Sequence, residues 1–303
     1  MITVAFLDVG QGDSSVITLP DRRTAHLIDC PGGKSRIVTA YVKEKEISEL
    51  DIVFVTHSDR DHANGIPGVV EDFGEANALA WNVDRSQIQQ NRRRRSIFQH
   101  LLLLHREQSI KRIEPRAETD DASKFEVQGA EILVLHPTPE DQERFRASSE
   151  QGKRNNASLL LRLSYGGRRV LFTSDLMLKG WQKIVDRKVD LSADILKYPH
   201  HGAWYQANPD YSLEDVFVKV APEFTVISTG TTNTYNHPNE NSLKILRAHS
   251  ARFLCTQATE RCWGKFVPSH EPVPCGGTIE IEVSGDGQLL FHTSNSPPLE
   301  CVP

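Results

Sequence analysis

The segment "LDIVFVT" at residues 50–56 constrains the fold more than any other part of the sequence. Its unbroken apolar run is typical of a strand that is buried on both faces. The segments before it, "ITVAFLDV", "SSVITL" and "TAHLIDC", are rich in β-branched residues and are broken by "GQGD" and "PDRR", which predicts hairpins. The helical spacing of apolar residues in "SRIVTAYVKEKEI" predicts a helix between the hairpins and the buried strand.

Strands and helices alternate along the rest of the chain, which predicts an α/β fold. One or two helices are expected from Ser86 to Ser109, and others at "LKGWQKIVDR" and "ENSLKILRAHS". The polar stretch "TPEDQERFRASSEQGKRNN" predicts a solvated helix and loop, and "GGTIEIEVSGDGQLLFHT" predicts a closing hairpin with its turn at "SGDG". Since no low-complexity linker divides the chain, residues 1–303 are expected to form a single domain.

The composition is that of a globular protein, with 303 residues, 38% hydrophobic and 25% charged. The net charge of −5 gives no reason to expect a protein that coats nucleic acid. The start "MITVAFLDVG" lacks the regions of an export signal, and no apolar run approaches the roughly 20 residues of a membrane helix. Five cysteines, an odd number, favour a reducing compartment. We therefore expect a cytoplasmic protein that does not bind a membrane.

The stretch "VFVTHSDRDHANGI" places His57, Asp59, Asp61 and His62 within six residues, directly after the predicted buried strand. Imidazole and carboxylate groups are ligands for divalent metals, and four of them this close together would repel or desolvate one another without a cation between them. The alternative is a polar loop whose aspartates cap a helix, but a cap does not require the flanking histidines. The pattern favours a metal site.

Further ligand types stand at the ends of other predicted strands. Asp175 follows "VLFTS", His200 and His201 follow "ILKYP", and His237 follows "FTVISTGTTNTYN". Asp175 alone could cap a helix, and His237 alone could be a turn residue. Their shared position at strand ends predicts that they gather with the first four residues.

Five blocks of the sequence, in this order, resemble the metallo-β-lactamase fold: "FLDVGQGDSSVITLP…HLIDC", "VFVTHSDRDHANGI", "NNASLLLRLSYGGRRVLFTSDL", "ADILKYPHHGA" and "VISTGTTNTYNHP". The resemblance is to the branch found as a domain of ComEC-type DNA-uptake channels, and it extends from the first strand to His237. It implies an αββα sandwich of four layers, in which two sheets pack face to face with helices outside. It also implies a hydrolytic site for one or two metals at one edge of the sheets.

By this resemblance, His57 and Asp59 would hold the first metal, Asp61 and His62 the second, and Asp175 would bridge the pair. The broad family pattern is H-x-H-x-D-H, and here Asp59 replaces the second histidine. A carboxylate in place of an imidazole hardens the first site, so Mn²⁺ or Mg²⁺ becomes an alternative to Zn²⁺.

The third ligand of the first site is open, because this chain has asparagines in "KRNNAS" where many relatives have a histidine. Either His200 or His201 is a candidate, with the other histidine facing the substrate, and the sequence does not separate them. His136 in "VLHPT" is more typical of a structural residue. His237 is assigned to the second metal.

Two metals would lower the pKa of a bridging water and clamp the attacked and leaving oxygens, which suits a phosphodiester. Asp59 or Asp61 could also orient that water, and His200 is the candidate that protonates the leaving oxygen. The expected function is therefore that of a metal-dependent phosphodiesterase or nuclease that cleaves DNA or RNA.

A nucleic acid would need cationic and stacking groups near the metals. Four consecutive arginines of "NRRRR" could contact a backbone or could be the solvated face of a helix: Arg92, Arg93, Arg94 and Arg95. Trp204 and Tyr235 could stack on bases, although packing at the edge of the fold is the favoured explanation. Asn156 is a further candidate for a substrate contact.

Other functions are compatible with the same fold, since its members also cleave thioesters, lactams, lactones and small phosphodiesters. A hydrolase of a small ester, thioester or phosphodiester is one alternative. The chain also resembles stand-alone members encoded in bacterial defence or mobile loci, so a partner-regulated effector is another. A binding protein with a decayed site is disfavoured, because most of the ligand set is present.

The C-terminal region has the chemistry for a structural zinc in Cys255, Cys262, His270 and Cys275. The spacing lacks the close C-x-x-C pair that makes such sites recognisable. Buried or free thiols are therefore the favoured interpretation.

Overall fold

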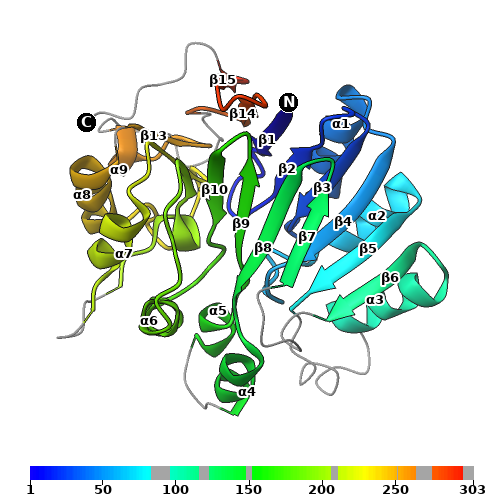
Figure 1. Ribbon diagram of the computed structural model, residues 1–303, viewed down its shortest axis with the longest axis horizontal. Helices are drawn as coiled ribbons and strands as arrows, with labels where there is room; N and C mark the ends of the chain where they lie inside the picture. The colour runs from blue at the N-terminus through cyan, green and yellow to red at the C-terminus, as the bar shows by residue number, and fades with distance from the viewer. Residues whose placement is uncertain are drawn as a thin grey trace.

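The computed structural model of the protein describes residues 1–82, 96–115, 123–147, 152–205, 211–250, 252–263 and 275–295. Two β-sheets lie face to face, and helices cover the outer side of each sheet (Figure 1). The αββα sandwich of four layers that the resemblance implied is therefore confirmed.

The first sheet has eight strands in the order β15-β14-β1-β2-β3-β4-β5-β6. β1 to β3 pair antiparallel, as the hairpin pattern predicted, and β3 to β6 pair parallel. The predicted closing hairpin is β14 and β15. The strand bounds are β1 (Ile2–Phe6), β2 (Ser15–Thr18), β3 (Thr24–Ile28), β4 (Glu49–Val55), β5 (Ala76–Trp81), β6 (Ile110–Pro115), β14 (Ile279–Val283) and β15 (Leu289–Thr293).

The second sheet has seven strands in the order β13-β12-β11-β10-β9-β8-β7. β7 to β10 pair antiparallel and β10 to β13 pair parallel. The strand bounds are β7 (Ser123–Val127), β8 (Ala130–His136), β9 (Leu160–Tyr165), β10 (Arg168–Phe172), β11 (Ile195–Lys197), β12 (Phe224–Ile227) and β13 (Arg252–Cys255).

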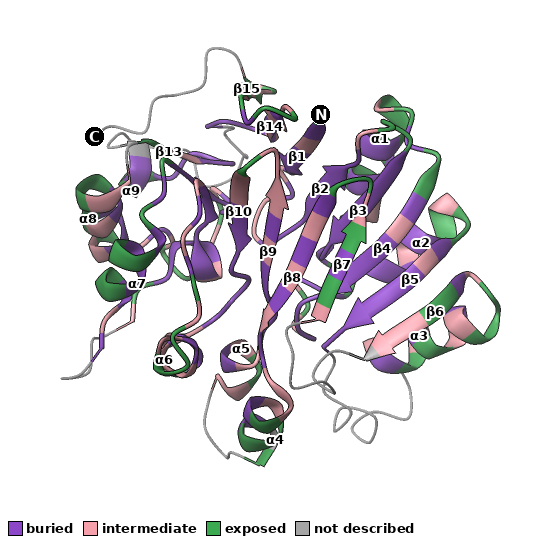
Figure 2. Ribbon diagram, in the orientation of Figure 1, coloured by how far each residue is buried: buried purple, intermediate pink, exposed green. Residues whose placement is uncertain are grey.

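The helices bury one side and expose the other (Figure 2). Those against the first sheet are α1 (Ser35–Glu44), α2 (Ile66–Phe73) and α3 (Ile97–Arg106). Those against the second are α6 (Leu178–Asp186), α7 (Leu213–Val220) and α8 (Glu240–His249). The shorter or peripheral ones are α4 (Pro139–Ala147), α5 (Lys153–Asn156), α9 (Glu260–Trp263) and the 3₁₀ turn η2 (Pro199–Gly202).

The expected helical region from Ser86 to Ser109 corresponds in part to α3, while residues 83–95 lie outside the described part of the chain. The solvated helix predicted in the polar stretch is α4, followed by the short α5. A search of the described helices finds none long and apolar enough to cross a bilayer.

The unbroken apolar run of β4 is explained by burial on both faces. Successive side chains of a strand point to opposite sides. Ile52 and Phe54 therefore enter the layer between the sheets, whereas Val53 and Val55 enter the layer beneath the helices. Phe6 of the first sheet and Phe172 of the second meet across the middle layer, with ring centroids 5.8 Å apart.

The carboxyl ends of parallel strands meet at one edge of a sheet. β3 and β4 of the first sheet, and β10 to β12 of the second, thus direct the residues that follow them toward shared edges. Every predicted ligand follows one of these strands.

The fold carries a buried histidine that should make it sensitive to acid. His26 on β3 is 1% exposed, with its Nδ1 3.7 Å from Asp51 Oδ2. Burial lowers the pKa of His26 to about 4, although Asp51 opposes the shift. Because the folded-state pKa lies below the ordinary value, the stabilising contribution is complete above about pH 6.5 and is lost as the pH falls toward 4.

Acidification through that window is expected to cost the wild type up to about 3 kcal/mol of unfolding free energy through His26 alone. Urea unfolding at pH 7 and pH 4.5 measures this loss, and His26→Gln should show a smaller one because its side chain does not titrate. His292→Gln, at a more exposed histidine of β15, is the matched control. Equal pH dependence in all three proteins would contradict the prediction.

Candidate metal centre

The loop between β4 and α2 carries the histidine and aspartate cluster and is tied to the loop after β3. The Cys30 N–H donates to the His62 carbonyl at 2.6 Å, and the Gly65 N–H donates to the Cys30 carbonyl at 2.9 Å. A Cβ at Gly65 would lie 2.2 Å from the Pro31 carbonyl oxygen, so only glycine fits there. These bonds fix the loop.

The second sheet contributes its ligand types through two strand ends. Asp175 follows β10, and η2 follows β11. The His200 N–H donates to the Ser174 carbonyl at 2.9 Å, which joins the two strand ends. His200, His201 and Gly202 have φ of 50°, 56° and 89°, a left-handed turn that costs about 1–2 kcal/mol for each non-glycine residue. The turn buries His201 and leaves His200 half-buried.

Four side chains, Asp61, His62, Asp175 and His201, form what we call the metal cluster. One ligand atom from each lies within 4.8 Å of all the others. The Nε2 atoms of His62 and His201 are 3.1 and 3.6 Å from Asp175 Oδ1. His201 Nε2 is also 3.5 Å from Asp61 Oδ2. Side chains from the loops of both sheets therefore meet at one oxygen of Asp175.

The other oxygen of Asp175 faces a second set of side chains. Asp175 Oδ2 is 3.5 Å from His200 Nε2 and 3.8 Å from His57 Nε2. His57 Nε2 is in turn 3.8 Å from Asp59 Oδ2. The carboxylate thus separates two groups of ligand types, one on each oxygen.

Two histidines of the metal cluster are oriented by hydrogen bonds at Nδ1. His62 Nδ1 is 2.8 Å from Asp29 Oδ2, and Asp29 also accepts from the Thr56 N–H at 2.8 Å. His201 Nδ1 is 3.1 Å from the Ser228 carbonyl oxygen. An acceptor at Nδ1 fixes the ring and directs Nε2 toward the cluster, the usual arrangement around a metal-ligating histidine.

A buried ion pair lies behind His201. Lys197 Nζ is 2.7 Å from Asp13 Oδ1, and both side chains are buried. Asp13 Oδ1 is also 3.5 Å from His201 Nδ1. Burial alone would raise the pKa of Asp13, but the charges of Lys197 and His201 hold it well below its ordinary value.

The buried atoms at the centre fit a divalent cation. Among the described residues, these buried atoms have no hydrogen-bond partner: His57 Nε2, His62 Nε2, His201 Nε2 and Asp175 Oδ1. Burial opposes charge here, yet the imidazolium groups hold the pKa of Asp175 well below its ordinary value. The carboxylates likewise hold the pKa of His62 well above its ordinary value and raise that of His201 to about 10. A cation would supply the positive charge that these protons otherwise provide.

His237 lies beside His200. Its ring centroid is 5.8 Å from that of His200, and burial together with the charges of His201 and His200 lowers its pKa to about 4. The structure puts His201, rather than His237, beside Asp61 and His62. The assignment of His237 to the second metal stays a prediction: its ring packs against that of His200, and its Nδ1 is buried without a hydrogen-bond partner among the described residues.

The proposed substrate contacts differ in their surroundings. Asn156 is buried and its Oδ1 accepts from the Gly180 N–H at 2.9 Å, so its amide carbonyl joins α5 to α6 instead of facing a substrate. Trp204 and Tyr235 are 36% and 68% exposed. Four expected contacts lie outside the described residues: Arg92, Arg93, Arg94 and Arg95.

His136 has the structural role that the sequence suggested. Its Nε2 lies 2.8 Å from the Asn156 carbonyl oxygen, and its Nδ1 lies 3.5 Å from Asp141 Oδ2.

Cys255, Cys262 and Cys275 are buried. Cys255, Cys262 and Cys275 do not form a metal-ligating group among the residues that the structure describes, and His270 lies outside them. The favoured interpretation from sequence, buried thiols, agrees with these positions.

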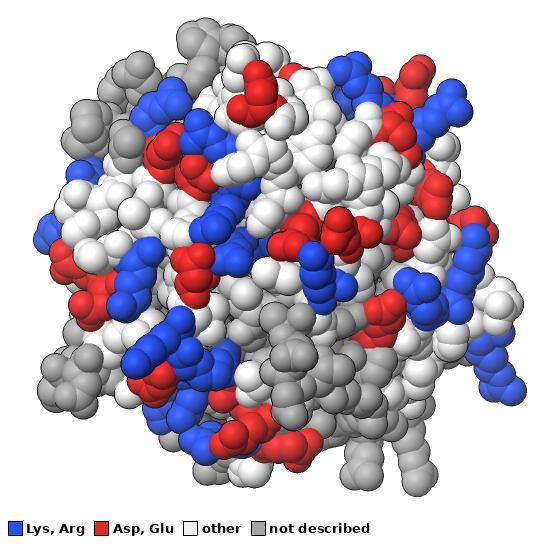
Figure 3. Space-filling view, in the orientation of Figure 1, with Lys and Arg blue, Asp and Glu red and all other residues white. Residues whose placement is uncertain are grey.

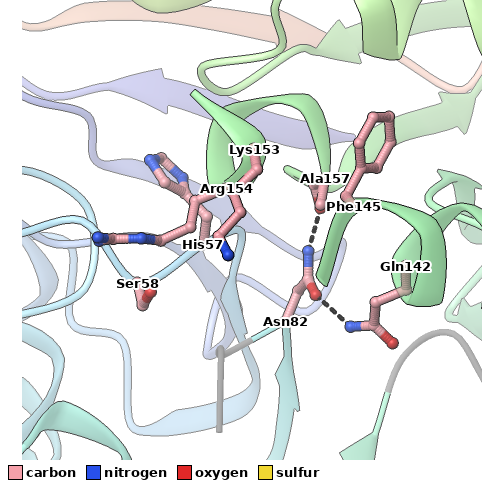
Figure 4. A pocket seen from close by; sticks show the side chains of 8 residues that line it. All are labelled: His57, Ser58, Asn82, Gln142, Phe145, Lys153, Arg154 and Ala157. Atoms are coloured by element: carbon pink, nitrogen blue, oxygen red, sulfur yellow. Dashed lines mark hydrogen bonds between the residues drawn. The ribbon is translucent and has the colours of Figure 1, made fainter. Parts of the chain in front are cut away.

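A pocket opens beside His57 (Figure 4). In that view the side chains of Lys153 and Arg154 extend from α5 toward the side where His57 and Ser58 lie. Arg154 Nη1 is 2.6 Å from Asp59 Oδ1, an ion pair that joins the pocket to the second ligand group.

Sequence reasoning missed four polar residues around the site: Asp13, Asp29, Arg154 and Lys197. Asp29 directly follows β3 and Asp13 belongs to "GQGD", so an acidic residue next to a strand end was an available signal. Lys197 ends an apolar strand, where a lysine is unusual. Arg154 lies in a polar stretch and carries no signal of its own.

Two bacterial proteins are similar to this chain in sequence. The sequence is 28% identical over 272 residues to ComE operon protein 3 of Bacillus subtilis (strain 168), a match that covers 84% of this chain and 31% of that protein. It is 36% identical over 104 residues to competence protein ComA of Neisseria gonorrhoeae, covering 34% of this chain and 14% of that protein. The chain thus matches less than a third of the length of either relative.

Among solved structures, the metallo-beta-lactamase fold protein YhfI from Bacillus subtilis is similar, with a TM-score of 0.47 and 12% identity, covering 84% of this chain and 96% of that one. The family described as the metallo-beta-lactamase superfamily matches residues 7–213. With two thirds of its length matched, the chain belongs to the metallo-beta-lactamase superfamily of metal-dependent hydrolases.

Proposed function

We propose that the protein is a metal-dependent phosphodiesterase that cleaves DNA or RNA. The observation that carries this proposal is the position of Asp175, whose two oxygens face two separate groups of imidazoles and carboxylates. Two ligand groups that share one carboxylate suit a pair of divalent cations, an arrangement that phosphatases and nucleases use.

The ligand assignment follows the two oxygens. One cation would be held by Asp61, His62 and His201, and the other by His57 and Asp59, with Asp175 between them. The carboxylate of Asp59 in place of an imidazole favours Mn²⁺ beside Zn²⁺, and makes Mg²⁺ acceptable.

Both the cations and the side chains of the protein would take part in the reaction. When bound, such cations supply an activated water near neutral pH and neutralise charge on the phosphoryl oxygens. Asp61, whose side chain is 37% exposed, would accept a hydrogen bond from that water and orient it. His200 would donate a proton from Nε2 to the leaving oxygen, and the Tyr205 hydroxyl bonds its Nδ1 and fixes the ring.

Several features support a nucleic acid as the substrate. One relative is named a competence protein, and the sequence blocks resemble a domain of DNA-uptake channels. Tyr235 is 68% exposed with its ring 5.7 Å from that of His237, and Trp204 is 36% exposed, so both can offer a face to a base. Basic and acidic side chains are interspersed on the face drawn in Figure 3. Recognition of a backbone would therefore depend on local cationic groups.

We also propose that residues 1–303 form a single domain, because the two sheets share the buried layer that contains Phe6, Phe54 and Phe172.

Metal-dependent cleavage should require the carboxylates of Asp61 and Asp175. With Mn²⁺, Mg²⁺ or Zn²⁺ added, Asp61→Ala and Asp175→Ala are expected to lower turnover of labelled DNA or RNA at least about a hundredfold, the loss of several kcal/mol of transition-state stabilisation. Gel assays on single- and double-stranded DNA, RNA and bis(p-nitrophenyl) phosphate measure it, with Asp190→Ala at an exposed acid as the control.

Retained turnover in either cluster variant, with the fold verified by circular dichroism, would contradict the assignment. Activity on bis(p-nitrophenyl) phosphate alone would instead indicate a small-molecule phosphodiesterase.

The orientation of His62 by Asp29 should control metal affinity. Asp29→Asn places an amide against Nδ1 and favours the wrong tautomer, so the affinity for Mn²⁺ is expected to fall about 10- to 100-fold. Titration calorimetry on metal-free protein measures it, and Asp190→Asn should leave the affinity unchanged. Equal affinities in the two variants would show that Asp29 has no part in orienting the ligand.

Stacking on Tyr235 should contribute to binding of a single strand. Tyr235→Ala is expected to weaken binding of a labelled oligothymidylate by roughly 5- to 100-fold, since base stacking on an aromatic ring is worth about 1–3 kcal/mol. Tyr235→Phe keeps the ring and should keep the affinity. Fluorescence anisotropy measures both, and equal losses in the two variants would point to the hydroxyl group instead.

A further inference from the structure

The pocket beside His57 adds residues that the proposed function does not use. His57, Asn82, Gln142, Phe145, Lys153 and Arg154 contribute to its lining. It adjoins the ligand group on Asp175 Oδ2, because His57 belongs to both. Asn82 directly follows β5, so this pocket stands at the same edge of the first sheet as the loop after β4.

The Asn82 amide of the pocket is already satisfied by the protein. Asn82 Oδ1 accepts from Gln142 Nε2 at 2.6 Å, and Asn82 Nδ2 donates to the Ala157 carbonyl oxygen (Figure 4). Asn82 Nδ2 also donates to the Thr56 carbonyl oxygen. Asn82 and Phe145 are 7% and 6% exposed. These residues therefore make a fixed, buried wall, and they have little capacity to bind a polar ligand themselves.

The pocket also contains two cationic residues. Lys153 and Arg154 are consecutive in α5, and the Arg154 side chain is 44% exposed. Arg154 Nη1 bonds Asp59 Oδ1, which leaves Asp59 Oδ2 on the side of His57. Among the described residues, the guanidinium group of Arg154 has one hydrogen-bond partner, the Asp59 carboxylate. Because a guanidinium group carries five N–H donors, further donors remain for a ligand in the pocket.

We propose that this pocket is an anion subsite for a phosphate group next to the scissile phosphate, and that Arg154 binds that phosphate while it holds Asp59. Two adjacent cations beside a fixed wall suit an anionic group, and the planar fork of a guanidinium group matches phosphate oxygens. The inference rests on the proposed function and deepens it. By this proposal, the site prefers a substrate with several linked phosphodiesters over a substrate with a single phosphodiester.

The first experiment measures binding without turnover. Thymidine 3′,5′-bisphosphate is titrated into metal-free protein in chelator and followed by calorimetry. Arg154→Gln is expected to weaken its binding about tenfold or more, as for loss of a hydrogen bond to a charged group. Arg154→Lys should keep part of the affinity, because it retains the charge without the fork. Arg144→Gln is the matched control, since Arg144 is exposed and pairs with Glu140 on α4.

The second experiment compares cleavage of dT3, which has a neighbouring phosphate, with cleavage of dT2, which has none. The ratio of kcat/KM for dT3 over dT2 is expected to be about ten or more in the wild type, mainly through KM, and to fall toward one in Arg154→Gln. Arg144→Gln should keep the wild-type ratio.

The outcomes separate the two proposals. Cleavage of DNA with the same dT3-to-dT2 ratio in Arg154→Gln and Arg144→Gln would overturn the subsite and leave the nuclease proposal standing. Binding of the bisphosphate that depends on Arg154, in a protein that cleaves no polynucleotide, would support the subsite and count against the nuclease proposal. Equal bisphosphate affinity in all variants would overturn the subsite.

Discussion

The Asp175 carboxylate lies between imidazoles that belong to two different sheets, and the rest of the site is arranged around it. His57 and His62 follow β4 of the first sheet, whereas His200 and His201 follow β11 of the second. These groups come within 4 Å of Asp175 because the apolar layer between the sheets fixes the distance between the strand ends. A buried carboxylate is stable there only because the opposing charges offset its desolvation.

The alternation of strands and helices was predictable because hydrophobic patterns report burial directly, whereas the four-layer sandwich was implied by the family resemblance. The apolar run of β4 required cover on both faces, and the sandwich supplies it. The hairpins from β1 to β3 and the closing hairpin were visible from their turn residues. The sequence did not show how the strands divide between the two sheets, since that depends on pairing between distant segments.

The candidate site was predictable where ligand types lie at strand ends, as for Asp61, His62 and Asp175. The choice between His200 and His201 was not, because it depends on the left-handed turn at η2, which turns one ring inward. The ion pair of Arg154 with Asp59 was equally hidden, since it joins residues that are 95 positions apart in the chain.

The division of the centre between two sheets has a consequence for the order of folding. The loop after β4 holds only part of the ligand set, and the remainder arrives with β10 and β11, more than a hundred residues later. A cation therefore has no complete coordination sphere until the two sheets have docked, unlike a zinc finger, in which the metal organises the chain. Once bound, the same ion would tie the sheets together and would have to be released before they could separate, which would slow unfolding and make the loaded protein kinetically persistent.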